Sequence, residues 1–370
     1  MSRQRIPVAA PALVGREREY VLDCLDSTWI SSNGKYLERF ESAFAEFCGV
    51  RHAVSCCNGT AAVHLALLAH DVGLGDEVIV PTLTYVATAN PVVYCGAQPV
   101  FVDAEPRTWN MDPERVAEAV TSKTRGIIVV HLYGHPVDMD PILELAEKHG
   151  LWVIEDAAEA HGATYRGRIA GSMGSLATFS FYGNKIITSG EGGMVVTDDE
   201  RLAEIVRQLH GQGQDLERRY WFPMVGFNYR MTNIEAAIGL AQLERIDWHL
   251  GRRREIAAWY REELSDVEGV ELSPHEPWAE SAFWITCAVL NEERFGPRDD
   301  AMAVLDRAGI ETRPFFYPLH TLPMYRDANV GKGFPIAEDL ARRGVNLPSS
   351  ATLTRDEVSY VCDQLRALAR

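Results

Sequence analysis

One lysine stands between a short apolar run and a cluster of glycines in the segment SFYGNKIITSGEGG, residues 180–193. An ordinary lysine has a pKa of about 10.4 and is a poor nucleophile at neutral pH. In a closed and partly desolvated site, a lysine loses its proton more easily and forms a Schiff base with a carbonyl group. Lys185 is therefore a candidate nucleophile. The alternative is a plain turn with a solvated lysine, and the rest of the chain decides between the two.

Further polar residues follow other short apolar runs of the chain. In open parallel sheets, ligands bind outside the carboxyl ends of the strands, so residues in these places are candidates for a common site. The candidates are Asn58, Gly59, Thr60, Thr84, Tyr85, Asp156, Glu159 and the residues from Ser180 to Lys185.

Asn58, Gly59 and Thr60 are expected to open a helix, because the apolar stretch AAVHLALLA follows them. The first N–H groups of a helix have no partner inside it, and a glycine lets a ligand come close to the chain, so this pattern can hold a phosphate group. It is also compatible with a plain helix cap. The patterns GxGxxG and GxxxxGK[ST] are absent, which counts against a dinucleotide-binding fold and an NTPase.

Asp156 ends the apolar run WVIED and has two interpretations. Either it caps the segment that follows, or it faces the ring nitrogen of a bound heterocycle. A pyridinium cofactor needs such a carboxylate, because the negative charge keeps the ring protonated and able to withdraw electrons. A phosphate-binding helix start, a ring-facing Asp156 and an imine-forming Lys185 together indicate pyridoxal 5′-phosphate.

The region from about residue 50 to 200 alternates short runs rich in Val and Ile with longer amphipathic segments. The runs are too short for helices, and most are separated by stretches long enough for a crossover helix. This pattern predicts an α/β fold with a mostly parallel sheet that is buried on both faces. The predicted strands are HAVSC, DEVIVP, QPVFVDA, RGIIVVHLYG, LWVIEDAA, LATFSF and GGMVVTDD.

The pattern changes near residue 250. The stretch that leads across this point predicts one long helix, or two helices joined near Gly251. Beyond it, the strand candidates FWITCAVL and GIETRPFFYP surround the helix candidate DDAMAVLDRAG, and Thr354 is placed to cap a final amphipathic helix. We therefore predict a large domain over residues 1–250 and a smaller C-terminal α+β domain over residues 251–370.

The composition narrows the classes of function. The 370 residues include 36 Lys and Arg against 52 Asp and Glu, a formal net charge of −16, which disfavours nucleic acid or an anionic membrane as the main partner. No run has the length of a transmembrane helix or the apolar core of a signal peptide, so we expect a cytoplasmic protein. The seven cysteines are scattered without a CxxC pair, so we expect neither a disulfide framework nor a metal site.

With these motifs in this order, the sequence resembles the DegT-type sugar aminotransferases, which use pyridoxal phosphate and have the aspartate-aminotransferase fold (fold type I). The resemblance covers nearly the whole chain and implies a homodimer whose active sites lie at the subunit interface. It depends on TWISSNG (28–34), NGTAAVHLAL (58–67), DEVIVPTLTYVATAN (76–90), VIEDAAEAHGA (153–163), FSFYGNKIITSGEGG (179–193), VGFNYRMTNIEAAIGLAQLE (225–244) and ETRPFFYPLH (311–320).

The resemblance also implies a role for each matched residue. Lys185 would form the Schiff base, Asp156 would face the pyridine nitrogen, and Glu159 would hydrogen-bond the ring hydroxyl. Tyr85 would stack on the ring, although it is also compatible with a core aromatic. Asn228 would reach the cofactor phosphate of the neighbouring subunit, although it is also compatible with a turn. The phosphate within the same subunit would be bound by Gly59, Thr60 and Ser180.

Three segments, TWISS, HLYGHPVDMDPILE and RRYWFPMVGFNYRMTNIEAAIGLAQLE, are most similar to family members that use L-glutamate to aminate C4 of GDP-4-keto-6-deoxymannose. An enzyme for another nucleotide sugar or a cyclitol would keep the same cofactor residues. Related dehydratases carry histidine in place of Lys185, so the lysine favours transamination; a non-enzymatic regulatory role is the remaining alternative. Candidate contacts to the nucleotide sugar, each also compatible with a structural role, are Trp29, Ser31, Arg313, Tyr317 and His320.

Overall fold

The computed structural model describes residues 5–369, and its centre is a seven-stranded sheet with the order β1-β9-β8-β5-β4-β2-β3. Each of the seven apolar runs of residues 50–200 forms one of its strands, which confirms that prediction. The strands are β1 (His52–Cys56), β2 (Glu77–Pro81), β3 (Gln98–Val102), β4 (Thr124–Val130), β5 (Trp152–Asp156), β8 (Leu176–Ser180) and β9 (Gly193–Thr197).

The sheet is mostly parallel. Strands β3, β2, β4, β5 and β8 run in the same direction, whereas β9 is antiparallel to both of its neighbours, β1 and β8. Inside the sheet, Ile154 of β5 pairs with Ile128 of β4 on one side and with Leu176 of β8 on the other. The carboxyl ends of the parallel strands therefore meet along one edge, where Asp156 ends β5 and Ser180 ends β8.

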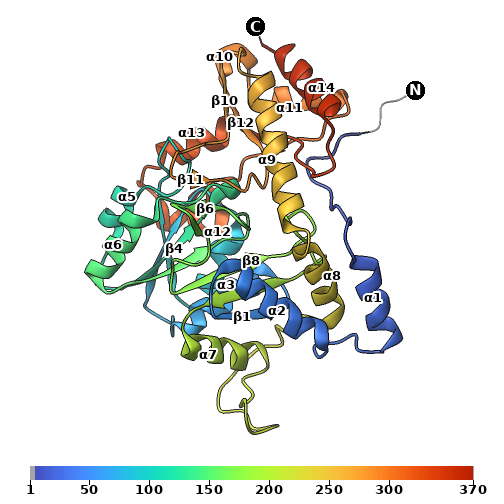
Figure 1. Cartoon of the computed structure of the whole chain (residues 1–370). Helices are drawn as coiled ribbons and strands as arrows, with labels where there is room; N and C mark the ends of the chain where they lie inside the picture. The colour runs from blue at the N-terminus through green and yellow to red at the C-terminus, as the bar shows by residue number, and fades with distance from the viewer. Residues whose placement is uncertain (1–4, 370) are drawn as a thin grey trace.

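Helices pack on both faces of this sheet (Figure 1). On one face, Val116 and Ile142 from two helices pack against Ile127 of β4. On the other face, Val63 packs in a cluster with Ile128. The helices of this part are α1 (Glu17–Asp26), α2 (Lys35–Cys48), α3 (Gly59–Ala69), α4 (Asn90–Tyr94), α5 (Pro113–Ala119), α6 (Met139–His149), α7 (Glu200–His210) and α8 (Asn233–Leu243), with the 3-10 turns η1 (Val86–Thr88) and η2 (Leu132–Gly134).

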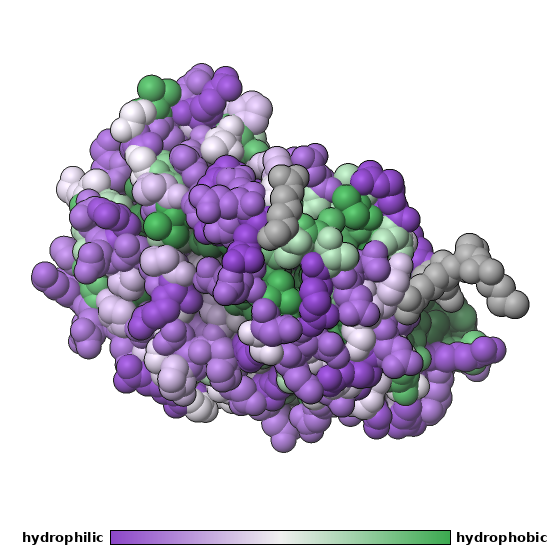
Figure 2. Space-filling view, turned by 90° about the horizontal axis from the view of Figure 1, so that it is seen from above, coloured by the Kyte–Doolittle hydropathy of each residue, from purple (hydrophilic) through white to green (hydrophobic). Residues whose placement is uncertain are grey.

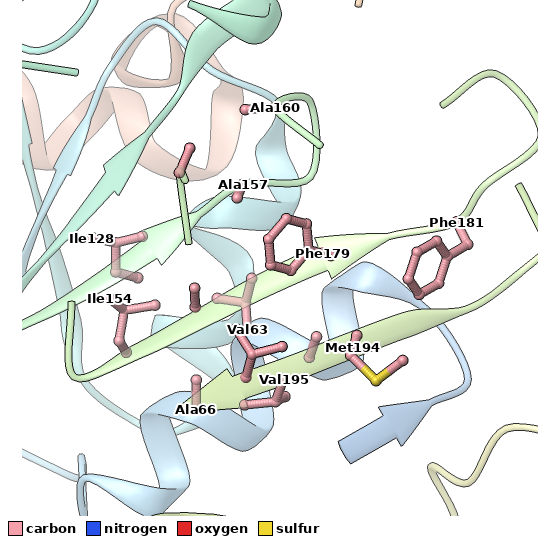
Figure 3. Close-up of a cluster of buried hydrophobic side chains, with 14 of the residues drawn as sticks. Val63, Ala66, Ile128, Ile154, Ala157, Ala160, Phe179, Phe181, Met194 and Val195 are labelled. Carbon is pink, nitrogen blue, oxygen red and sulfur yellow. The ribbon is translucent and has the colours of Figure 1, made fainter. Parts of the chain in front are cut away.

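The core around α3 fixes the start of that helix relative to β8. Figure 3 shows Val63 and Ala66 of α3 beside Val195 of β9, with Phe179 of β8 in the same cluster. These side chains are at most 3% exposed, and full burial of one such large apolar side chain contributes roughly 1.5–3 kcal/mol. The apolar helix predicted after Asn58 therefore packs as expected, and its first turn lies next to the end of β8.

The C-terminal part has its own antiparallel sheet with the order β10-β12-β14-β13. The predicted strands FWITCAVL and GIETRPFFYP contain β12 and β13, and the final helix begins with the predicted cap Thr354, whose hydroxyl accepts from the N–H of Glu357. The strands are β10 (Val270–Leu272), β12 (Cys287–Leu290), β13 (Arg313–Pro314) and β14 (Gly344–Asn346); the helices are α10 (Glu292–Phe295), α11 (Arg298–Arg307), α12 (Pro323–Arg326), α13 (Pro335–Arg343) and α14 (Arg355–Arg366), with the turns η3 (Leu319–Thr321) and η4 (Asp327–Asn329).

Helix α9 (Ile246–Glu263) runs from the large sheet to the C-terminal part (Figure 1). The prediction of a joint near Gly251 is wrong, because Gly251 lies inside α9 and the break from α8 comes earlier, at Glu244 and Arg245. Arg245 leaves the helical conformation with a φ of −116° and a ψ of 15°, whereas Gly251 is accommodated within the regular helix. The division of the chain into 1–250 and 251–370 would cut α9, and it stays a prediction.

Backbone pairing also joins the two parts. Ile6 forms an isolated parallel bridge with Ile310, so the N-terminal segment packs against the C-terminal part. A small sheet pairs β11 (Ala279–Glu280) with β6 (Thr164–Tyr165), which also pairs with β7 (Arg168–Ile169). The molecular face seen from above is largely hydrophilic (Figure 2). Within residues 5–369, no helix combines the length and the apolar character needed to cross a bilayer.

Candidate active site

A cavity of about 520 Å³ opens at the carboxyl edge of the seven-stranded sheet. Its walls come from the segments after β1, β2, β5 and β8 and from the strands and loops of the C-terminal part. The fold therefore brings together residues that are more than 250 positions apart in the chain, from Gly59 to Arg313. The predicted site residues among its lining are Asn58, Gly59, Thr60, Thr84, Tyr85, Asp156, Glu159, Ser180, Tyr182, Asn184, Lys185 and Arg313.

Lys185 lies in a turn directly after β8, where its N–H donates to the carbonyl oxygen of Tyr182 at 2.9 Å. Its side chain is 12% exposed, and its Nζ lies 3.9 Å from Oε1 of Glu159. Burial lowers the pKa of the Lys185 amine, and the carboxylates of Glu159 and Asp156 oppose this effect. The amine is thus less basic than in water, which is the condition for attack on a carbonyl carbon at neutral pH.

Asp156 is the last residue of β5 and is buried. Its Oδ2 accepts a hydrogen bond from the Thr88 hydroxyl at 2.8 Å, and its Oδ1 accepts from the N–H of Ala158 at 3.2 Å. Burial raises the pKa of Asp156, and these two hydrogen bonds and the charge of Lys185 only partly offset it. A cationic N–H group of a ligand would therefore find a desolvated and oriented carboxylate here.

Glu159 lies in the loop after β5 and is also buried. Its Oε2 accepts from the N–H of Tyr133 at 2.7 Å. Burial raises its pKa to about 7, although the nearby Lys185 acts in the opposite direction. Burial therefore shifts the pKa values of this carboxyl and of the Lys185 amine toward each other.

The start of α3 forms a cradle against the ends of β8 and β9. Asn58 caps the helix by accepting from the N–H of Ala61 at 2.8 Å. A Cβ on Gly59 would lie 2.8 Å from Cβ of Ser180, and a Cβ on Gly193 would lie 2.4 Å from the carbonyl oxygen of Asn58. Only glycine therefore lets the helix start approach both strands, which explains the last glycine of SGEGG. The first N–H groups of α3 and the Ser180 hydroxyl face this cradle, which suits an anion.

A buried hydrogen-bond network supports the end of strand β5. Glu155, next to Asp156, accepts from Nε2 of His131 at 2.9 Å, and both side chains are fully buried. The same carboxylate accepts the N–H groups of Gly171, Met173 and Gly174. These bonds lower the pKa of Glu155 despite its burial, and they fasten β5 to the loop before β8.

Tyr85 and Arg313 stand on the open side of the cavity. Tyr85 is 57% exposed and touches the ring of Phe316, with 5.7 Å between centroids, so it is not a core aromatic. Arg313 of β13 is held by Glu311 at 3.2 Å. Both can meet a ligand that enters the cavity, and their roles stay predictions.

Asn228 lies outside the cavity lining of its own chain and is exposed. Its neighbours Phe227 and Tyr229 stack on each other at 4.9 Å and contact His64 of α3. Because side chains alternate along an extended segment, the amide of Asn228 is turned away from this packed face. Arg230 donates to its Oδ1 at 3.3 Å. The segment thus presents Asn228 on the outside of the molecule, and its role at a cofactor stays a prediction.

Trp29 and Ser31 are exposed and also lie outside the cavity lining. Their backbone carbonyls are held by one buried residue that sequence reasoning missed, Asn233, the first residue of α8. Its side chain donates to the carbonyl of Trp29 at 2.7 Å, its N–H donates to that of Ser31 at 2.6 Å, and its Oδ1 accepts from Tyr36. The segment around Trp29 is thereby fixed to the start of α8, five residues after Asn228.

Tyr317 and His320 are placed differently from Arg313. Tyr317 is 60% exposed and lines a separate hollow of about 370 Å³. His320 is buried, its Nδ1 lies 2.7 Å from the Thr82 hydroxyl and its Nε2 lies 3.1 Å from Glu338. These contacts occupy both ring nitrogens of His320. Neither residue belongs to the lining of the cavity around Lys185.

Among the lining residues that were not found from the sequence, Thr88 and Trp284 contact Asp156 and Lys185 directly. Thr88 ends the turn η1 and donates a hydrogen bond to Asp156. It lies four residues after the candidate Thr84 in the same segment, and this proximity could have indicated it as a site residue. Trp284 comes from the C-terminal part, and its ring centroid lies 4.1 Å from Nζ of Lys185. Nothing in the sequence around Trp284 indicates this contact. In the described part of the chain, no group of three or more His, Cys, Asp or Glu side chains is arranged to hold a metal ion, and the seven cysteines are free thiols.

Curated relatives match almost the entire chain. The GDP-perosamine synthase of Caulobacter vibrioides is 54% identical over 96% of this chain and 96% of its own length. The GDP-perosamine synthase of Escherichia coli O157:H7 is 49% identical over 97% of each. A structure of DesV from S. venezuelae is 36% identical and superposes with a TM-score of 0.92, covering 99% of this chain and 98% of that chain.

The fold comparisons also include a sugar aminotransferase, described as putative, in its PLP form: Spr1654 from Streptococcus pneumoniae, 28% identical, with a TM-score of 0.93 over 98% of both chains. These likenesses confirm the predicted aminotransferase fold with its mostly parallel sheet and smaller antiparallel sheets. The model of the DegT/DnrJ/EryC1/StrS aminotransferase family matches residues 11–366. This chain is a member of the DegT/DnrJ/EryC1/StrS aminotransferase family.

Proposed function

We propose that this protein is a pyridoxal-phosphate-dependent aminotransferase that moves the amino group of L-glutamate to C4 of GDP-4-keto-6-deoxymannose and so forms GDP-perosamine. The observation that carries the chemistry is the buried Lys185 amine in one cavity with Asp156 and the start of α3. A nucleophilic amine, a ring-facing carboxylate and an anion cradle are the three features that such a cofactor requires.

The choice of sugar is supported by a difference among the curated relatives. Three proteins named GDP-perosamine synthase are 54%, 49% and 45% identical to this chain over nearly its full length. Relatives with other names, such as EpsN and EryC1, are 38% and 39% identical. The matched length covers nearly the whole chain and so is not confined to the segments that line the cavity.

The residues of the cavity fit the cofactor by their chemistry. Asp156 would face the ring nitrogen, since its carboxylate is desolvated and no cation of the chain neutralises it fully. The first N–H groups of α3 and the Ser180 hydroxyl would bind the phosphate. Glu159 would meet the ring hydroxyl, and Tyr85 would cover one ring face. When bound, pyridoxal phosphate supplies an electron sink that stabilises negative charge at the substrate carbon.

The chain itself supplies proton transfer and exclusion of water. The Lys185 amine, when it does not hold the cofactor, would take the proton from the α-carbon of glutamate and pass it to the cofactor carbon that receives the amino group. In the second half of the reaction it would move a proton from that carbon to C4 of the sugar. A positioned proton-transfer group of this kind accelerates a reaction by roughly 10²–10⁴-fold. Burial keeps the pKa of Lys185 below its ordinary value, so the amine loses its proton more readily than a lysine in water.

Shared sites between two copies of the chain belong to the same proposal. Asn228 is exposed and lies outside its own cavity, so its amide would complete the phosphate site of a second copy. Asn233 bonds the carbonyl oxygens of Trp29 and Ser31. These two residues, held beside the start of α8, would therefore face the same neighbouring copy.

An aminotransferase for a different nucleotide sugar is the second candidate. A structure of DesI, described in the presence of its TDP-sugar product, is 38% identical to this chain and has a TM-score of 0.92. Such an enzyme would keep every cofactor residue, because the difference concerns only the sugar and the base. A dehydratase is disfavoured, since its relatives carry histidine where this chain has Lys185.

One experiment separates these candidates. The purified protein is incubated with L-glutamate and a panel of 4-keto nucleotide sugars with GDP, UDP and dTDP, and the products are identified by mass spectrometry. We expect an amino sugar from the GDP substrate, with one equivalent of 2-oxoglutarate. Preferred turnover of a dTDP or UDP substrate would favour the second candidate, and a deoxygenated sugar without consumption of glutamate would indicate a dehydratase.

A further inference from the structure

Trp284 is a cavity residue that the proposed function leaves without a role. It lies in the loop before β12, and its side chain is buried. Its indole nitrogen donates to the carbonyl oxygen of Asn184 at 2.8 Å, and its ring centroid lies 4.1 Å from Nζ of Lys185. One side chain therefore contacts both the turn that carries Lys185 and the reactive amine.

The position of this indole is fixed by groups other than the lysine. Arg253 of α9, itself buried, donates to the carbonyl oxygen of Trp284 at 2.8 Å. The ring of Tyr133 lies nearly parallel to the indole, with 6.4 Å between centroids and 16° between planes. A Cβ on Gly134 would come within 2.9 Å of the backbone nitrogen of Trp284, so the main chain that carries the indole is also closely packed. The framework thus holds the ring in place whether or not the amine is bonded elsewhere.

We propose that Trp284 is a positioning residue that holds the Lys185 amine, as an ammonium ion on its ring face, while the lysine carries a proton between substrate and cofactor. This inference rests on the proposed function. The negative face of an indole attracts a cation within about 6 Å of its centroid, and the attraction strengthens where water is excluded. The indole thereby offsets part of the burial that disfavours the charged amine.

Other groups also face Lys185 and act on the same equilibrium. Glu159 lies 3.9 Å away, and Asp156 also favours the charged amine. His161 is fully buried, and burial lowers its pKa to about 3, so it stays neutral. Glu191 and Arg313 line the same cavity. The two carboxyl groups come from the end of β5 and the loop after it, whereas the indole comes from the C-terminal part. Substitution of Trp284 therefore changes the contribution of the indole to the proton affinity of Lys185 and leaves both carboxyl groups in place.

The test measures the proton affinity of Lys185 directly. In the full-length protein freed of cofactor, the carbamylation of Lys185 by cyanate is followed as a function of pH by mass spectrometry of the peptide. For Trp284→Leu we expect the midpoint to fall by about one pH unit, a tenfold change in the protonation equilibrium. Trp284→Phe keeps an aromatic ring but loses the hydrogen bond to Asn184. Its midpoint should fall by less than half of this amount. Trp248→Leu, a change outside the cavity, should leave the midpoint in place.

A second measurement avoids any loss of folding. Growth with 5-fluorotryptophan and 5,7-difluorotryptophan replaces all eight tryptophans with rings of nearly the same shape and progressively weaker cation binding, and the midpoint of Lys185 should fall stepwise. An unchanged midpoint in this series or in Trp284→Leu would overturn the proposal. A shift in Trp284→Phe equal to that in Trp284→Leu would also overturn it, because the hydrogen bond to Asn184 would then explain the effect.

The loaded enzyme gives a separate readout. Trp284→Leu should slow a single turnover with glutamate about tenfold, whereas the affinity for pyridoxal phosphate should stay within about twofold, because the indole is not placed at the cradle or at Asp156. A wild-type protein that binds no cofactor would end the proposed function, whereas an unshifted Lys185 midpoint in a working enzyme would end only the role of Trp284.

Discussion

The hydroxyl of Thr88 donates a hydrogen bond of 2.8 Å to Oδ2 of Asp156, and both residues are buried. Thr88 ends the turn after β2, whereas Asp156 ends β5, and β4 lies between these strands in the sheet. The bond therefore orients the carboxylate from a neighbouring segment and leaves it aimed into the cavity.

Thr88→Val should weaken the binding of pyridoxal phosphate about tenfold, because a hydrogen bond to a charged group contributes roughly 1.5 kcal/mol. Titration of the cofactor-free protein by fluorescence gives the dissociation constant. Thr88→Ser keeps the hydroxyl and should stay close to wild type. Equal losses in both variants would mean that the methyl group, and not the hydrogen bond, is what matters.

Gly59→Ala should weaken the binding of pyridoxal phosphate by roughly 10- to 100-fold, because the added Cβ would lie 2.8 Å from Cβ of Ser180 and such crowding costs about 1–3 kcal/mol. Pyridoxal, which lacks the phosphate, should bind the variant and the wild type alike in equilibrium dialysis. The control is Gly73→Ala, since no atom lies within 4 Å of a Cβ at Gly73. A parallel loss for pyridoxal would place the effect outside the phosphate cradle.

The raised pKa of Glu159 makes a signed prediction for stability. Its carboxyl is protonated more readily in the folded state, with a pKa of about 7 against an ordinary value of 4.5, so the folded state binds more protons between these two values. Its contribution to the free energy of unfolding is therefore lost as the pH rises through this window. Glu159→Gln removes this loss.

Urea unfolding of the cofactor-free protein at several pH values checks this difference. We compare the free energy of unfolding of Glu159→Gln with that of the wild type. The difference, variant minus wild type, should increase by up to about 1–3 kcal/mol between about pH 4.5 and 7. A constant difference across the window would show that Glu159 titrates normally. Glu262→Gln, at an exposed position of α9, should show no such trend.

Mixed subunits test the placement of Asn228. Lys185→Ala and Asn228→Ala should each be inactive or nearly so, and their 1:1 mixture should recover about a quarter of the wild-type activity, since half of randomly paired dimers have one intact site of two. Lys185→Ala mixed with Asp156→Ala should recover nothing, because each change inactivates the site of its own subunit and a mixed dimer then has no intact site. Absence of recovery in the first mixture would remove Asn228 from the neighbour's site.

Much of the architecture follows from local pattern. Short runs rich in Val and Ile are typical of strands that are buried on both faces. Asn58 and Thr354 cap helices that the sequence predicts, because a side-chain oxygen there accepts from a backbone N–H that has no partner inside the helix. The same reasoning placed Lys185, Asp156 and Gly59 at strand ends or at a helix start. Parallel strands with crossover helices carry such residues to one edge of the sheet, which is why they line one cavity.

Tertiary structure alone decided which distant side chains meet them. The contact between Trp284 and Lys185, and the clamp of Asn233 on the segment around Trp29, join residues 99 and 204 positions apart, and no local periodicity records such a distance. The partners of His320 were also decided by the tertiary structure. Its motif predicted a contact with the substrate, but in the fold its two ring nitrogens contact Thr82 and Glu338. Sequence determines which groups can do chemistry, because that depends on residue type and local conformation. Their partners depend on how separate parts of the chain pack.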